Sequence, residues 1–175
     1  MILFFAILLG SIVIDQLSKW LVVANMQLGD SIPVLPKILD ITYSINDGAA
    51  FGMLDDSRWV FMIFSTVAIA AILFYVLRYR PQNPWILVSL SMIAGGGVGN
   101  MIDRVRLEYV IDFIDCSGLG FPWIFNFADA FVCVGCGLMI FDLLREIIAE
   151  SKAEKAAKAA KEADASGEKN DENGN

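Results

Sequence analysis

Two aspartates interrupt segments that are otherwise strongly apolar. Asp129 lies in FNFADAF, between FPWI and VCVGCGLMIF, and Asp112 lies in the preceding VIDFID. An ionisable side chain at membrane depth costs about 2.5 to 3.5 kcal/mol on insertion scales, so it usually faces a bundle interior and marks a functional site. We therefore expect Asp112 and Asp129 to meet near one membrane boundary, across a helix–loop–helix turn.

Two carboxylates around one water have a known chemical use. Repulsion between them raises the pKa of one member, so the pair shares one proton. The ionised carboxylate would take a proton from water, while the protonated one would hydrogen-bond a substrate carbonyl and help to protonate the leaving amine. Such a peptidase needs no metal, cofactor or covalent intermediate. The spacing alone leaves a second function open, a small proton- or cation-coupled transporter that uses the same aspartates.

Other polar residues fall on helix faces that could join this pair. Asp15 and Lys19 are four residues apart and can form an ion pair. Asn100, Asp103 and Arg104 recur at spacings of three and four, and a glycine-rich run before them, GGGVG, permits close helix approach. The alternative for each ion pair is a purely structural role. Asp115 lies close to Asp112 in sequence, and the alternative for it is that it is an ordinary loop aspartate.

The composition excludes several classes of protein. The 175 residues are 57% hydrophobic, which is too apolar for an ordinary soluble domain. The absence of histidine excludes HExxH zinc proteases and the Ser-His-Asp and Cys-His hydrolases. A formal net charge of −7, without a basic patch, argues against nucleic-acid binding. Cys133 and Cys136 lie in an apolar run, and we interpret them as helix-packing residues and not as a metal or redox site.

Four segments are long and apolar enough to span a membrane, so the expected fold class is a membrane all-α protein with a small β element. The predicted helices cover residues 2–24, 59–77, 84–102 and 121–141. Between the first two, in an outer region of residues 25–58, the run LDITYSIN alternates apolar and polar residues and predicts a half-buried strand. We expect this region to form a small sheet on the membrane surface.

The distribution of positive charge predicts the orientation. Arg78 and Arg80 lie between the second and third helices, and Arg145 and several lysines follow the fourth. By the positive-inside rule both termini are cytoplasmic, which places Asp112 and Asp129 at the outer face. Residues 1–149 form the membrane domain, and residues 150–175 form a charged tail that we expect to be helical and then disordered.

The chain resembles the lipoprotein signal peptidase (signal peptidase II) family in four blocks that occur in the family's order. They are DQLSKW (15–20), NDGAAFGML (46–54), GGGVGNMIDRVRLEYVIDFID (95–115) and FPWIFNFADAF (121–131). The resemblance implies a monomeric, multi-pass aspartyl endopeptidase of the bacterial cytoplasmic (inner) membrane, with its site at the extracytoplasmic face. Its substrates would be prolipoproteins with a diacylglyceryl group on the cysteine after the scissile bond, and globomycin-type peptides would inhibit it. Membrane lipid would surround the enzyme.

The resemblance also implies residue roles. Asp112 and Asp129 would be the catalytic pair, and Arg104 and Asn46 would orient the substrate backbone. The substrate-binding and supporting positions are Asp15, Lys19, Asn46, Gly48, Asn100, Asp103, Arg104, Asn126 and Ala128. Two departures from the family pattern lie close to this set: Asp47 adds negative charge, and Ala130 stands where many members have serine.

Overall fold

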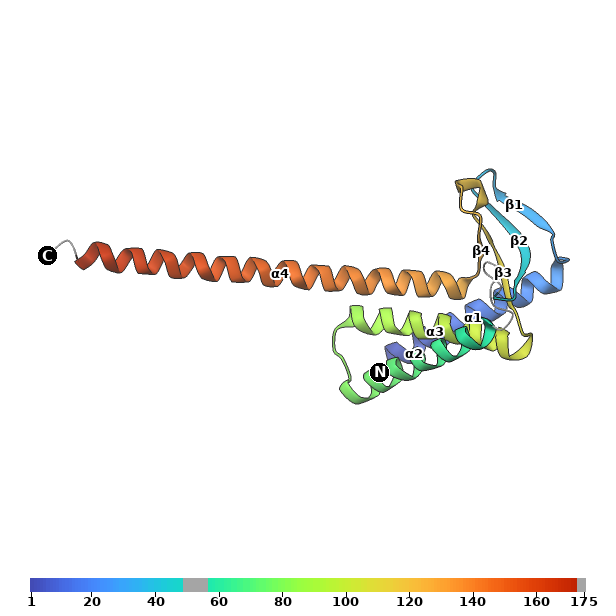
Figure 1. Cartoon of the computed structure of the whole chain (residues 1–175), viewed down its shortest axis with the longest axis horizontal. Helices are drawn as coiled ribbons and strands as arrows, with labels where there is room; N and C mark the ends of the chain where they lie inside the picture. The colour runs from blue at the N-terminus through green and yellow to red at the C-terminus, as the bar shows by residue number, and fades with distance from the viewer. Residues whose placement is uncertain (49–56, 173–175) are drawn as a thin grey trace. The chain divides into compact units, whose positions relative to one another are not determined.

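A computed structural model describes the backbone of residues 1–48 and 57–172 and the side chains of residues 1–48 and 59–155 (Figure 1). Within these ranges the chain forms the helices α1 (Ile2–Asn25), α2 (Ser57–Tyr79), α3 (Pro84–Arg106) and α4 (Phe127–Glu172). Each contains a segment long and apolar enough to cross a membrane. The chain divides into two compact units, Met1–Met139 and Ile140–Asn175. The predicted fold class is confirmed.

The strands form one antiparallel sheet in the order β1 (Ser31–Leu35), β2 (Leu39–Asn46), β3 (Val110–Asp115) and β4 (Ile124–Phe125). The strand predicted from LDITYSIN has the bounds of β2. Pairing of β2 with β3 sets Ser44 opposite Asp112 and Asn46 opposite Val110. A short 3₁₀ helix, η1 (Ser117–Leu119), connects β3 to β4.

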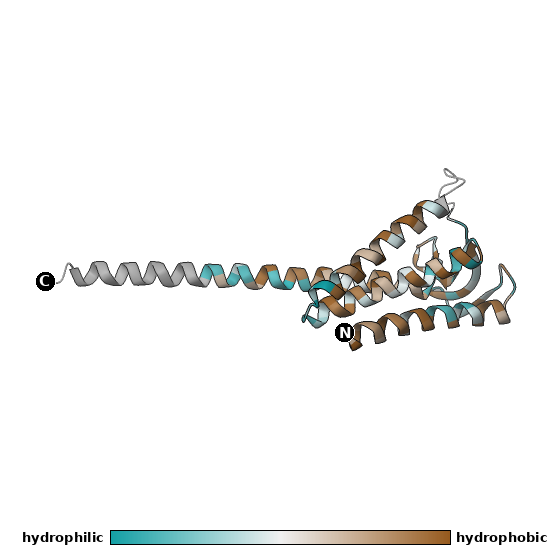
Figure 2. Cartoon of the chain, turned by 90° about the horizontal axis from the view of Figure 1, so that it is seen from below, coloured by the Kyte–Doolittle hydropathy of each residue, from teal (hydrophilic) through white to brown (hydrophobic). Residues whose placement is uncertain are grey.

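Apolar residues pack in two separate clusters. The first joins α1, α2 and α3 through Phe4, Val76 and Leu87, one from each helix. The second joins the end of α1 to β3 through Val22, Ile111 and Phe113, and so fixes the sheet at the end of the bundle where α1 and α3 end. Many large apolar side chains of the helices are exposed. In Figure 2, much of the helical ribbon is brown, the colour of hydrophobic residues. A lipid environment accounts for that exposure.

Glycines of α3 allow its neighbours to approach closely. A Cβ at Gly95 would lie 2.8 Å from Ser11 Cβ of α1, and one at Gly96 would collide with the Ala128 carbonyl oxygen of α4. These backbones meet where larger side chains would separate them. The glycine run therefore holds the polar residues of three helices within hydrogen-bonding distance.

Two predicted boundaries differ from the structure. α3 continues beyond residue 102 to Arg106, and α4 begins at Phe127 instead of residue 121. Pro122 disfavours helical conformation at the residue before it, and β4 then pairs with β3. The expected helix–loop–helix turn is therefore wrong, because Asp112 reaches the site on a strand.

In the tail, the backbone of α4 continues to Glu172. The division into a membrane domain and a tail that becomes disordered from Ser166 stays a prediction. Once a helix is formed, each further residue adds a hydrogen bond without a new nucleation cost, and the alanine- and lysine-rich run upstream supplies that start.

Candidate active site

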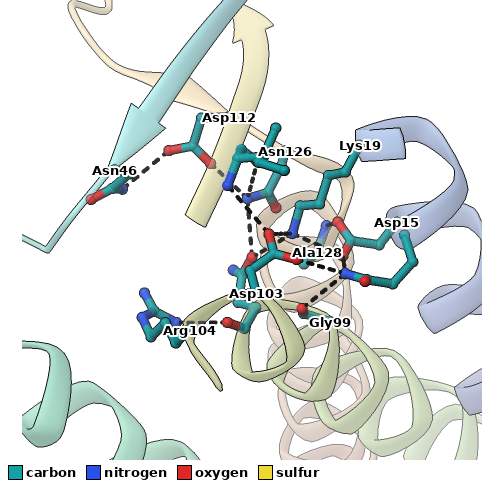
Figure 3. A network of polar contacts seen from close by, with 12 residues as sticks. Asp15, Lys19, Asn46, Gly99, Asp103, Arg104, Asp112, Asn126 and Ala128 are labelled. Carbon is teal, nitrogen blue, oxygen red and sulfur yellow. Dashed lines mark hydrogen bonds and ion pairs between the residues drawn. The ribbon is translucent and has the colours of Figure 1, made fainter. Parts of the chain in front are cut away.

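Lys19 is the charged centre of the polar cluster. It is 2% exposed, and its Nζ lies 2.9 Å from Asp15 Oδ2 and 2.9 Å from Asp103 Oδ2. It also donates a hydrogen bond of 2.9 Å to Asn100 Oδ1. Buried charges are tolerated when they are paired and hydrogen-bonded, as here. The predicted Asp15–Lys19 pair thus forms, and it links α1 to α3 (Figure 3).

Asp15 also fixes the start of α4. Its Oδ1 accepts a hydrogen bond of 2.9 Å from the backbone N–H of Ala128, one of the free N–H groups in the first turn of that helix. The negative charge interacts favourably with the positive end of the helix dipole. Gly99 makes room for this contact, because a Cβ there would lie 2.5 Å from Asp15 Oδ2.

Asn126 and Asp129 form a reciprocal cap at the first turn of α4. Asn126 Oδ1 accepts from the Asp129 backbone N–H at 2.9 Å, and Asp129 Oδ2 accepts from the Asn126 backbone N–H at 3.3 Å. This is the geometry of a capping box, with Asn at the cap and Asp three residues on. Asp129 Oδ1 accepts from Asn100 Nδ2 at 2.8 Å. Both carboxylate oxygens of Asp129 are therefore held in place.

Asp112 is held on β3 by two amides. Its side chain is buried, with Oδ1 accepting from Asn126 Nδ2 at 2.6 Å and Oδ2 accepting from Asn46 Nδ2 at 3.1 Å. Asn46 Oδ1 in turn accepts from Gly48 N at 3.0 Å, which orients the Asn46 amide group toward Asp112. Gly48 has φ +83°, a conformation that favours glycine.

Asn126 therefore connects the two aspartates of the predicted pair. Its side chain contacts Asp112 through Nδ2 and the Asp129 backbone through Oδ1. Burial raises the pKa of Asp112 to about 6, and the negative charge of Asp129 is the second cause. A carboxyl with such a pKa can hold a proton at weakly acidic pH beside an ionised neighbour.

Arg104 places a positive charge beside the pair. Its Nη1 donates to the Asn100 carbonyl oxygen at 3.4 Å, and its guanidinium lies 5.4 Å from the centre of the Phe61 ring of α2. Asp129 and Asp112 are both within electrostatic range of it. Negative charge that developed on a substrate oxygen here would be stabilised.

Asp103 and Gln16 join α1, α3 and β3 behind the pair. Asp103 Oδ2 accepts from the Ile111 backbone N–H at 3.2 Å, next to Asp112, and Asp103 Oδ1 accepts from Gln16 Nε2 at 2.9 Å. Gln16 was not among the site residues predicted from the sequence. It lies one position from Asp15, on a different side of the helix, and its length lets it reach Gly99 O at 3.2 Å.

Asp115 lies apart from the pair. It is three positions from Asp112 on one strand, so the two side chains leave opposite faces of the sheet. Its oxygens accept from Thr42 Oγ1 at 2.9 Å and from the Ser117 backbone N–H at 2.9 Å. The Ser117 N–H lowers the pKa of Asp115. These contacts indicate that it stabilises the sheet and η1.

Residues 49–54 of the second sequence block lie outside the described residues. In the part that is described, no three His, Cys, Asp or Glu side chains are arranged to hold a metal ion. Cys116, Cys133 and Cys136 are free thiols.

Comparison with known proteins adds a family and a fold. The family model of signal peptidase (SPase) II matches residues 7–145. Two solved structures, each titled as a bacterial membrane enzyme determined by the in meso method, at 2.3 Å and 1.9 Å, are both 34% identical to the chain with TM-scores of 0.75. The first match covers 82% of this chain and 88% of the other, and the second covers 81% and 92%.

Proposed function

The chain belongs to the signal peptidase II family of aspartic-type endopeptidases, and we propose that Asp112 and Asp129 are its catalytic pair. It is a multi-pass membrane protease, with four helices able to span a membrane in its described part. The observation that carries the proposal is that Asn126 donates to both carboxylates, to Asp112 through its side-chain amide and to Asp129 through its backbone N–H. The transporter alternative gains no support from the family match.

In the proposed mechanism, Asp112 begins protonated and Asp129 ionised. Asp129 takes a proton from the attacking water, and the Asp112 proton hydrogen-bonds the scissile carbonyl. Water oxygen bonds to the carbonyl carbon, and Arg104 stabilises the charge on the carbonyl oxygen. The C–N bond then breaks, a proton from the pair passes to the leaving amine, and the pair returns to a single shared proton.

The other polar residues have supporting roles in this proposal. Asn46 and Arg104 orient the substrate backbone, and Gly48 orients Asn46. A second group holds the start of α4 and thereby Asp129: Asp15, Lys19, Asn100, Asp103, Asn126 and Ala128. A globomycin-type inhibitor would place its hydroxyl between the two aspartates, at the position proposed for the attacking water.

We propose that the substrates are diacylglyceryl-modified prolipoproteins, cut before the lipidated cysteine at the extracytoplasmic face of the bacterial inner membrane. The site lies at the end of the bundle beside the sheet, where a lipid anchor would hold the scissile bond at the headgroup boundary. Each buried methylene of the anchor adds about 0.8 kcal/mol to binding. The enzyme would act as a monomer.

The test is cleavage by purified full-length chain in detergent. Matched precursors with and without the diacylglyceryl group are compared, with Asp129→Asn protein as the inactive control. We expect efficient cleavage of the lipidated precursor alone, unaffected by chelators, serine reagents or thiol reagents. Equal turnover of both precursors would contradict the substrate, and loss of activity with a chelator would contradict the mechanism.

A further inference from the structure

An apolar groove of about 520 Å³ lies between α2 and α3. Ile69, Ala70 and Leu73 line it from α2, and Val98, Ile102 and Arg106 are among its lining residues on α3. Thr66, at its outer end, donates its hydroxyl to Met62 O of its own helix at 2.7 Å, so this polar group is already satisfied. The groove follows α2 from Thr66 to Leu73, about 10 Å at 1.5 Å per residue.

The outer end of the groove adjoins the active site on both helices. Val105, which lines it, follows Arg104 directly. On α2, Phe61 contacts the Arg104 guanidinium and lies five residues before Thr66, about 7.5 Å along the helix. The apolar groove therefore begins close to a molecule bound at Asp112 and Asp129, and it leads into the membrane-spanning part of the bundle.

We propose that this groove is the subsite for one acyl chain of the substrate's diacylglyceryl group, an inference that rests on the proposed function. The lipidated cysteine adjoins the scissile bond, so its acyl chains are tethered beside Arg104. This tethering gives them a high effective concentration at the mouth of the groove, which a free phospholipid lacks. The exposed Arg106 at the mouth can donate hydrogen bonds to the ester carbonyl oxygens of the glyceride.

Filling the groove tests the proposal, and neighbouring alanines of α2 give a matched pair. Both alanines are exposed, but only Ala70 lines the groove, because Ala71 belongs to a side of the helix about 100° away. For a dipalmitoyl precursor, Ala70→Phe should raise KM at least about tenfold, the equivalent of about two methylenes no longer buried. Ala70→Phe should leave kcat little changed, and it should also leave the KM of a dibutyryl precursor little changed. Ala71→Phe should change neither kcat nor the KM of either precursor.

A second measurement uses the unaltered chain and needs no catalysis. A diacylglyceryl-cysteine peptide without the signal sequence, with a photoreactive group at the end of one acyl chain, is cross-linked to the protein in detergent. Labelling within residues 66–73 and 98–106 supports the groove. Labelling elsewhere, or equal effects of Ala70→Phe and Ala71→Phe, would overturn it. If the chain cleaved no lipidated precursor, the proposed function would fail, and the cross-link would still decide the subsite.

Discussion

Asp112 combines burial with a neighbouring negative charge, and this gives its proton a defined role. Both effects favour the neutral carboxyl, which raises its pKa to about 6. In the mechanism proposed above the protonated form polarises the carbonyl. The value of kcat/KM, which reports the free enzyme, should therefore fall as pH rises through about 6. A rate that climbs steadily from pH 5 to pH 8 would assign the proton to another group.

The same pKa makes a prediction about stability. Because the pKa of Asp112 in the folded state lies above the ordinary value of 3.8 for an aspartate, the folded state binds more protons between about pH 4 and pH 6. The free energy of unfolding therefore decreases as pH rises across that window. Asp112→Asn removes this dependence. The melting temperature of the variant minus that of the unaltered chain should therefore increase from pH 4 to pH 7. A constant difference would contradict the burial of a titrating carboxyl here.

Asp112 and Asp129 should behave as one unit. Asparagine keeps the size of each side chain but cannot share the proton, so either change should lower kcat at least about a hundredfold, the lower range of general acid–base catalysis. The double variant should be little worse than each single one. Asp115→Asn is the control, since that carboxylate contacts Thr42 and Ser117 and not the pair. Substantial cleavage by folded Asp129→Asn protein would refute the assignment.

At the scale of elements, one asparagine both caps α4 and bridges the two aspartates. Asn126→Ser keeps an oxygen that can cap the Asp129 N–H but loses the amide that reaches Asp112. Asn126→Ala loses both and should cost about 1 kcal/mol more in stability. Activity should be equally low in the two variants, because neither restores the bridge. Full activity in Asn126→Ser would show that the cap alone positions the site.

Close helix approach is a second requirement at this scale. In Gly99→Ala the new methyl would meet Asp15 Oδ2 at 2.5 Å and Ala128 Cβ at 3.3 Å, so the Asp15–Ala128 contact must shift. We expect a loss of about 1 to 3 kcal/mol in stability, as in other overpacked sites, and a large loss of activity. Gly10→Ala on α1 and Gly137→Ala on α4 are matched controls, because a Cβ at either meets nothing within 4 Å. Thermal unfolding and the cleavage assay measure both effects.

How well an element could be predicted from the sequence depended on how deeply it is buried. β2 is partly buried along most of its length, so its apolar and polar residues alternate and its bounds were predicted. In β3 four consecutive residues, Val110 to Phe113, are buried, which removes the alternation that identifies a strand. Hydropathy alone extended the fourth helix back to residue 121. The N-x-x-D pattern of Asn126 and Asp129 was the available signal for its start.

In the candidate site, too, some contacts could be predicted from the sequence and others could not. Contacts within or between helices followed from spacings of three and four, as for Asp15 with Lys19. The Asn46–Asp112 contact depends on the register of β2 against β3, which no spacing along the chain reveals. The assignment of Asp112 and Asp129 as catalytic came from the family resemblance, and it stays a prediction until the variants are assayed.

At the scale of the whole molecule, the sheet and the polar cluster share one end of the bundle. Val22, Ile111 and Phe113 pack the sheet onto α1, and Asp103 bonds the β3 backbone at Ile111. The loop between α2 and α3 lies at the other end of the bundle, away from the sheet, and carries Arg80. From the positive-inside rule we predict that this loop is cytoplasmic and that the sheet lies outside.

Cysteine labelling in intact cells would test that orientation. On a background with Cys116, Cys133 and Cys136 replaced, Lys37→Cys lies in the turn between β1 and β2, and Gln82→Cys lies between α2 and α3. A membrane-impermeant maleimide should label position 37 in intact cells and position 82 only after the membrane is opened. The reverse pattern would move the polar cluster to the cytoplasmic face. A secreted precursor anchored in the outer leaflet could then not reach Asp112 and Asp129, so the orientation and the proposed substrate are tested together.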